Sequence, residues 1–220
     1  MKKIVTVFLA AMFFLAGITP ATAQDKVEAS LGANLVSRYV WRGQDLGGVS
    51  VQPSLGLSYK GISLSAWGSV GLSNPQDARE VDLTLGYTIG GFNIGVTDYW
   101  VEDSHVFEGT VGYDFGFASL NWYTNFAGND ISADTGKCAF SSYFEANVPF
   151  SLGGLEWKAT AGVVPFATDY YGASRFAVVN LALTATKELR ITDSFSLPVF
   201  AQLAVNPHSR HLYLVLGISL

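Results

Sequence analysis

Two arginines are the most specific candidates for chemistry in this 220-residue sequence. Arg38 and Arg42 lie four residues apart in the segment VSRYVWRG, a spacing that puts both side chains on one face of an extended strand. Two guanidinium groups at the mouth of a polar passage would attract anionic solutes. Alternatively, they pair across the interior with a carboxylate, Glu108 or Glu145. Both interpretations stay open at the level of sequence.

The other chemistry-bearing residues do not form a catalytic or metal-binding motif. The three histidines, at 105, 208 and 211, show neither metal-ligand nor nucleophile-elbow spacing. A lipid hydrolase would need adjacent Ser and His side chains, and nothing in the sequence marks His105 and Ser142 as neighbours, although both fall on the apolar strand face. The single cysteine, Cys138, permits no intramolecular disulfide and ends a polar stretch typical of a loop. We therefore expect no enzyme activity, no cofactor and no metal site.

The elements that position these residues are predicted to be β-strands. From Val81 to Ile89 apolar and polar residues alternate without a break, which is the two-residue period of a strand. The same alternation, interrupted by turn residues, continues to Leu220. It predicts about twelve strands, an even number as bacterial barrels have. Their expected ranges are near 27–42, 50–59, 62–73, 80–89, 92–101, 105–115, 117–126, 139–149, 155–165, 175–186, 195–205 and 210–220.

The connections and the aromatic residues narrow the class of fold. Short connections, such as 60–61 and 90–91, alternate with longer ones, such as 127–138 and 166–174. Aromatic residues of the apolar face gather at both strand ends, with aliphatic residues between them. They are Tyr59, Phe92, Phe115, Phe150, Trp157 and Phe195 at the short-turn ends, and Tyr39, Trp41, Trp100, Phe126 and Phe140 at the long-loop ends. This pattern predicts an all-β fold, a transmembrane up-and-down antiparallel β-barrel with two aromatic girdles.

Composition and the N-terminal residues agree with export to a membrane. Residues 1–23 combine Lys2 and Lys3, an apolar run and the sequence Ala-Thr-Ala, which is the pattern of a cleaved signal peptide. Residues 24–220 then form the barrel domain. Only 14% of the residues are charged, and the mean hydropathy is +0.28, so much of the surface is expected to avoid water. Residues 24–220 carry a formal charge of −7, which argues against nucleic acid as a partner.

The polar strand face is expected to line the lumen. It is rich in Ser, Thr, Asn and Gly, whereas soluble ligand-binding barrels have an apolar interior. Its charged members would order ions in a water-filled pore or form salt bridges that plug a narrow barrel. The candidate pore-lining residues are Arg38, Arg42, Trp67, Asp82, Glu108, Asp114, Glu145, Glu156 and Lys158.

Three stretches resemble the TorF-type porin family of Gram-negative outer-membrane β-barrel proteins. They are Asn34–Gly43 (NLVSRYVWRG), Val51–Leu55 (VQPSL) and Ser65–Ser69 (SAWGS). The closing residues Leu197–Phe200, Asn206–Pro207 and Ile218–Leu220 are similar to the Bacteroidetes version of that family. The resemblance covers the first third and the last strand pair. It implies an outer-membrane barrel and carries over no binding residues.

These observations together predict a porin-like channel for passive diffusion of small hydrophilic solutes in the bacterial outer membrane. Its partners would be outer-membrane lipid, the solutes and the barrel-assembly machinery during insertion. One alternative is a non-conducting structural or surface-interaction barrel that acts through its extracellular loops. A less favoured alternative is an outer-membrane lipid hydrolase.

Overall fold

A computed structural model describes residues 26–74, 77, 79–193 and 195–220. The predicted signal peptide, 1–23, therefore lies outside the described residues. Within the described ranges the regular structure is entirely β. The described part of the chain contains no helix of the length and apolarity needed to cross a membrane.

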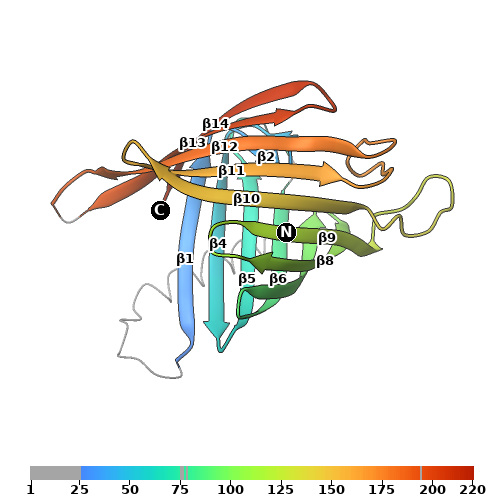
Figure 1. Ribbon diagram of the computed structural model, residues 1–220, viewed down its shortest axis with the longest axis horizontal. Helices are drawn as coiled ribbons and strands as arrows, with labels where there is room; N and C mark the ends of the chain where they lie inside the picture. Colours follow the sequence, from blue (N-terminus) through green and yellow to red (C-terminus); the bar gives the residue numbers. More distant parts are fainter. Residues whose placement is uncertain (1–25, 75–76, 78, 194) are drawn as a thin grey trace.

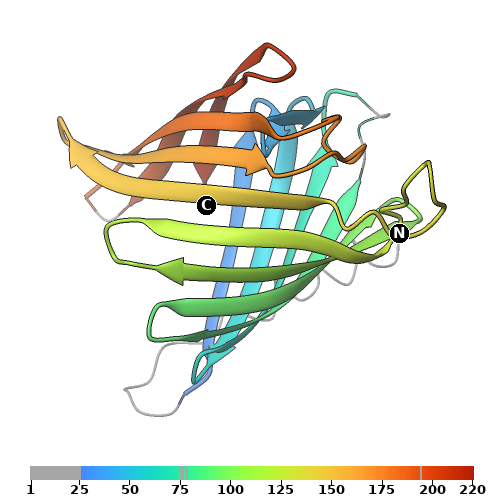
Figure 2. The same cartoon turned by 45° about the vertical axis from the view of Figure 1, so that its right-hand side comes forward.

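Twelve antiparallel strands close into one barrel, which confirms the predicted fold class (Figures 1 and 2). Each strand pairs with the next along the barrel, and β1 closes the ring between β4 and β14. The barrel strands are β1 (Glu28–Val36), β4 (Ser50–Tyr59), β5 (Ile62–Gly71), β6 (Glu80–Ile89), β7 (Phe92–Val101), β8 (Ser104–Asp114), β9 (Ser119–Gly128), β10 (Ser142–Leu152), β11 (Leu155–Val164), β12 (Ala177–Arg190), β13 (Ser196–Asn206) and β14 (His211–Ser219).

The pleat faces the way that the alternation predicts. Leu85 and Leu214 lie on the outer wall with 58% and 59% of their surface exposed. On the opposite face the hydroxyls of Thr84 and Thr97 are 2.9 Å apart, and Gln202 donates to Thr184. Because successive side chains of a strand point to opposite faces, one face of the barrel wall is apolar and the other is polar. The apolar face is the outer one, and we call it the outer wall.

The connections sort by length at the two ends of the barrel. Residues 60–61, 90–91 and 153–154 link strands by tight turns. The longer connections 129–141 and 165–176 extend beyond the opposite end (Figures 1 and 2). We call the end with long connections the loop end and the other the turn end.

The prediction of a first strand over residues 27–42 is wrong in its second half. Strand β1 ends at Val36 instead of continuing to residue 42. The chain then forms a two-stranded hairpin outside the barrel sheet, with strands β2 (Tyr39–Trp41) and β3 (Gln44–Gly47). The range 43–49, which separates the first two predicted strands, therefore holds a strand. We call residues 39–47 the hairpin. Its position inside the barrel determines the candidate site.

Candidate functional site

A two-residue turn places Arg42 at the tip of the hairpin. Trp41 pairs with Gln44, so that Arg42 and Gly43 form the turn, and both have positive φ angles of 48° and 76°. This is the backbone of the tight hairpin turns that match strand twist. A Cβ at Gly43 would overlap the carbonyl oxygen of Val179, so glycine is required here by close approach as well. Arg42 accepts a left-handed conformation that costs about 1 kcal/mol in an L-residue, so its side chain must gain more than that from its contacts.

Arg42 forms a buried ion pair with Glu108 on the barrel wall. Its two terminal nitrogens lie 2.6 and 2.8 Å from the two carboxylate oxygens of Glu108. The side chains are only 8% and 2% exposed. Tyr99 donates a third hydrogen bond to Glu108 at 2.8 Å, and Arg42 also donates to the hydroxyl of Tyr171 at 2.6 Å. A planar guanidinium held by both oxygens of a carboxylate is a strong, geometrically specific contact.

Aromatic rings surround the guanidinium of Arg42. Its central carbon lies 4.4, 4.0 and 4.7 Å from the ring centres of Trp41, Tyr123 and Tyr143. Cations are attracted to the faces of such rings, more strongly when water is excluded. Burial raises the pKa of the Tyr171 phenol against the opposing effect of Arg42. The charge of Arg42 is therefore balanced by Glu108 and not by a phenolate.

The hairpin contacts wall strands around most of the barrel. The ring of Tyr39 packs at a tilt against Trp67 of β5, and its hydroxyl donates to Glu80 of β6. Trp41 packs against Tyr99 of β7, and the contacts of Arg42 reach β8, β9 and β10. At the tip, the carbonyl of Gly43 accepts from the side-chain amide of Asn206 on β13, and the α-carbon side of Gly43 lies against the carbonyl of Val179 on β12. The hairpin thus crosses the lumen and obstructs it.

The connection 165–176 adds a second layer to this obstruction. Tyr170 and Tyr171 pack against Trp41, and Tyr171 also stacks on Tyr143. The buried apolar cluster at this level comprises Tyr143, Val164, Tyr171, Ala173, Ala177 and Val179. A packed core therefore occupies the loop-end half of the lumen, where the polar strand face alone would predict water.

Gly162 on β11 has no side chain, and the ring of Tyr143 occupies the space that a side chain would fill. A Cβ at this position would overlap the ring and hydroxyl of Tyr143, which bonds Glu145 and Asn180. We expect Gly162→Ala to lower the free energy of unfolding by about 1–3 kcal/mol, because the ring must leave its place under Arg42. Urea unfolding of the folded barrel measures this. Gly109→Ala is the matched control, since its Cβ would meet Phe126 at an ordinary 3.7 Å, and equal effects of the two would contradict the expectation.

The structure separates the two arginines that the sequence analysis paired. Because β1 ends at Val36, the prediction that Arg38 and Arg42 share one strand is wrong. Arg38 stays 44% exposed and pairs with Asp45 of the hairpin. Arg42 instead forms the predicted alternative contact, the ion pair across the interior with Glu108.

The other predicted lumen residues fall into two groups. Trp67 and Asp82 oppose each other on β5 and β6, next to the contacts of Tyr39, and Glu145 accepts from Tyr143 and Asn147. These three lie close to the hairpin. The second group is exposed near the turn end: Asp114 accepts from the amide of Gly116, Glu156 accepts from Ser151, and Lys158 lies opposite Pro149. The structure does not bring this group to the Arg42 cluster.

Several site residues were assigned differently or missed. Tyr39 and Trp41 were expected in the outer aromatic girdle, but the hairpin carries both into the lumen, and Tyr39 is only 9% exposed. Tyr170 and Tyr171 lie in a connection and were not singled out. The signal available in the sequence was Trp-Arg-Gly-Gln at 41–44, a two-residue turn between extended residues.

Comparisons with known proteins add no family to this picture. No protein-family model matches the sequence, and no curated protein matches it either. The resemblance to TorF-type porins therefore stays a prediction.

The residues considered for hydrolase chemistry have other partners. His105 lies 2.9 Å from Asp98 and stacks on Trp100, on the outer wall near the loop end. Ser142 lies two strands away, where it bonds Thr124 and the carbonyl of Phe140. Among the described residues, no group of three or more His, Cys, Asp or Glu side chains is placed to hold a metal ion.

Proposed function

We propose that the protein is an outer-membrane β-barrel with a porin-like lumen for small hydrophilic solutes, which the hairpin closes in the described conformation. The observation that carries the membrane part is the outer wall of exposed leucines, typified by Leu83, Leu85 and Leu214. A wall of this kind is stable against hydrocarbon and unfavourable in water. The proposed function includes no enzymatic step.

Support for a passage comes from the turn-end half of the lumen. There the wall carries hydroxyl and amide pairs, such as Thr160 with Asn147 and Gln202 with Thr184, together with the exposed charges Glu156 and Lys158. Such groups are hydrated in open barrels. Small solutes would enter this half and stop at the hairpin.

A non-conducting barrel is the second candidate, favoured by one observation. The hairpin contacts β5 to β10 and also β12 and β13, so closure involves most of the wall. If this closure is permanent, function would lie in the extracellular loops.

Planar-bilayer conductance separates the two candidates. Val36 and Ser50 are directly opposed on β1 and β4, so a Gly-Ser linker in place of residues 38–48 can join the two strands without disturbing the barrel. We expect rare openings from the natural sequence and reproducible conductance steps from the hairpin-deleted variant. Arg38→Ala with Asp45→Ala is the control, since it removes only an exposed ion pair and should conduct like the natural protein. Silence of a correctly folded deletion variant would favour the non-conducting barrel.

A further inference from the structure

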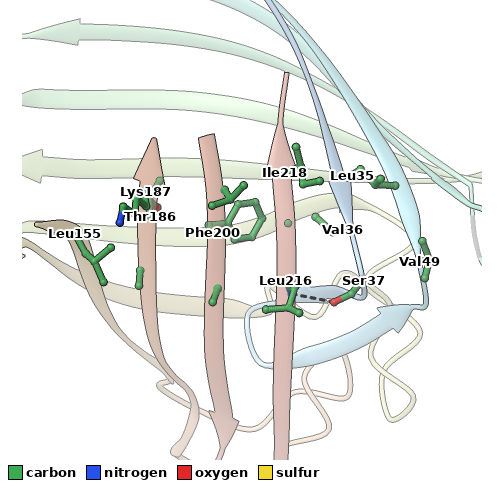
Figure 3. Close-up of a pocket in the computed structure, with 14 residues that line it drawn as sticks. Leu35, Val36, Ser37, Val49, Leu155, Thr186, Lys187, Phe200, Leu216 and Ile218 are labelled. Carbon is green, nitrogen blue, oxygen red and sulfur yellow. Dashed lines mark hydrogen bonds between the residues drawn. The ribbon is translucent and has the colours of Figure 1, made fainter. Parts of the chain in front are cut away.

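The outer wall is hollowed by an apolar groove where the barrel closes. The groove has a volume of about 660 Å³ and crosses the outer face from β11 to the start of β4. Figure 3 shows Leu155 and Lys187 at one end, Leu216 and Ile218 in the middle, and Leu35 on the far side. These five residues belong to the outer wall, so that a ligand in contact with them would face the surroundings of the barrel. The rest of the lining includes Val36, Thr186, Phe200 and Gly217, which alternate with the outer residues along their strands.

The register of the strands explains the depth of the groove. Ala185 of β12 lies directly opposite Ala201 of β13, and Ala201 opposes Leu216 of β14. The neighbouring row holds Lys187, Val199 and Ile218. Two small side chains beside this row of larger ones leave a trough, and Lys187, Val199 and Ile218 form one of its walls. The floor is therefore fixed by backbone pairing, not by flexible side chains.

The groove also covers the shortest seam of the barrel. The register of β1 with β14 covers residues 34–36, flanked by backbone hydrogen bonds of Ala33 with Leu220 and of Ser37 with Leu216, whereas the register of β1 with β4 runs along residues 28–36. Leu35 and Ile218 oppose each other across that seam and both line the groove. A ligand lying here would bury apolar surface from both strands at once, which would stabilise the closure.

One cation lies at the turn end of the groove. Lys187 is exposed, lies three residues from the end of β12 and shares the outer face with Val199. The ion pairs found among the described residues do not include it. An ammonium at the end of an apolar trough is complementary to a ligand with an anionic head and a hydrocarbon tail.

We propose that this groove binds one anionic phospholipid of the inner leaflet, with the phosphate at Lys187 and an acyl chain along Ala185, Ala201 and Leu216. The proposal rests on the proposed membrane location, because that location supplies the lipid. In the orientation of an outer-membrane barrel, the turn end faces the periplasm, where the inner leaflet places its headgroups.

Native mass spectrometry of the folded barrel in neutral detergent with added phosphatidylglycerol tests this. We expect one lipid per barrel in the natural protein. Lys187→Glu should weaken retention about fivefold or more, and Ala201→Trp should abolish it by filling the trough. Lys158→Glu and Leu214→Trp are the matched controls, because Lys158 is on the lumen face and Leu214 is outside the groove; both should retain the lipid.

Three results would overturn the proposal. They are no retained lipid in the natural protein, equal retention by Ala201→Trp, or a barrel dimer that Ala201→Trp disrupts, since a second copy would then occupy the groove. Flotation of the protein with lipid vesicles is measured separately. Failure to insert there refutes the membrane location itself, whereas insertion without a retained lipid refutes only the groove.

Discussion

Replacing Arg42 with alanine is expected to release the hairpin from the lumen. The substitution leaves Glu108 buried without its cation, and removing one partner of a buried ion pair typically costs about 3–5 kcal/mol. Glu108 is 2% exposed, so water cannot reach it while the hairpin stays docked. The hairpin is a separate two-stranded element, and its release leaves all twelve wall strands paired. We therefore expect local undocking and not unfolding of the barrel.

Limited proteolysis and bilayer conductance measure this release. In Arg42→Ala, cleavage within residues 38–48 should become faster, and conductance steps should approach those of the hairpin-deleted variant. Arg38→Ala is the control, because its exposed ion pair with Asp45 contributes at most about 1 kcal/mol. The double variant Arg42→Met with Glu108→Leu should restore much of the protection, since it leaves no unpaired buried charge. Equal protection of Arg42→Ala and the natural protein would show that the remaining contacts, which are the aromatic packing and the hydrogen bonds of Tyr39 and Gly43, are enough to hold the hairpin.

The second large effect is expected from a charge on the outer wall. Leu85 lies between Leu64 of β5 and Val96 of β7 on that wall and is 58% exposed. In water, Leu85→Arg at such an exposed position would change stability little. Facing the middle of a bilayer, it would destabilise the folded barrel by about 2–4 kcal/mol. The sign and size of this one change therefore report what surrounds the wall.

Ser65→Arg supplies the matched control for Leu85→Arg. Ser65 lies opposite Thr84 on the lumen face, one residue from Leu64, so that it tests the same level of the barrel from the other side. Urea unfolding in lipid vesicles should show a large loss for Leu85→Arg and a small one for Ser65→Arg. Similar losses would contradict a membrane-facing wall. A loss only for Ser65→Arg would contradict it too, because Leu85→Arg would then behave as it would in water.

The exposed aromatic side chains at the two ends of the barrel agree with the predicted aromatic girdles. Phe92, Phe115 and Phe195 at the turn end are 40–50% exposed, and Phe126 and Phe140 at the loop end are 43% and 54% exposed. These residues lie where aromatic side chains would meet a membrane interface. Tyr39 and Trp41 were placed among them because their parity in an uninterrupted strand is the outer one. The break after Val36 removed them from the wall.

The amino-acid sequence by itself determined the strands of the barrel wall and which of their side chains face outward. Alternation such as Val81–Ile89 is local, and a two-residue period assigns each side chain to a face without knowledge of partners. Tight turns such as Lys60–Gly61 are local too. Strand number, antiparallel order and the outward position of the leucines followed from these features.

Only the tertiary structure determined which side chains fill the lumen and contact one another there. Whether Arg42 continues a strand or turns back depends on Glu108, 66 residues later, and on Tyr171, 129 residues later. The turn at Arg42 is unfavourable locally and becomes stable only through these contacts. Periodicity within a segment contains no information about which distant side chains meet. The sequence could offer Glu108 only as one of two alternative partners of Arg42, and it is the closed barrel that brings Arg42, Glu108 and Tyr171 together.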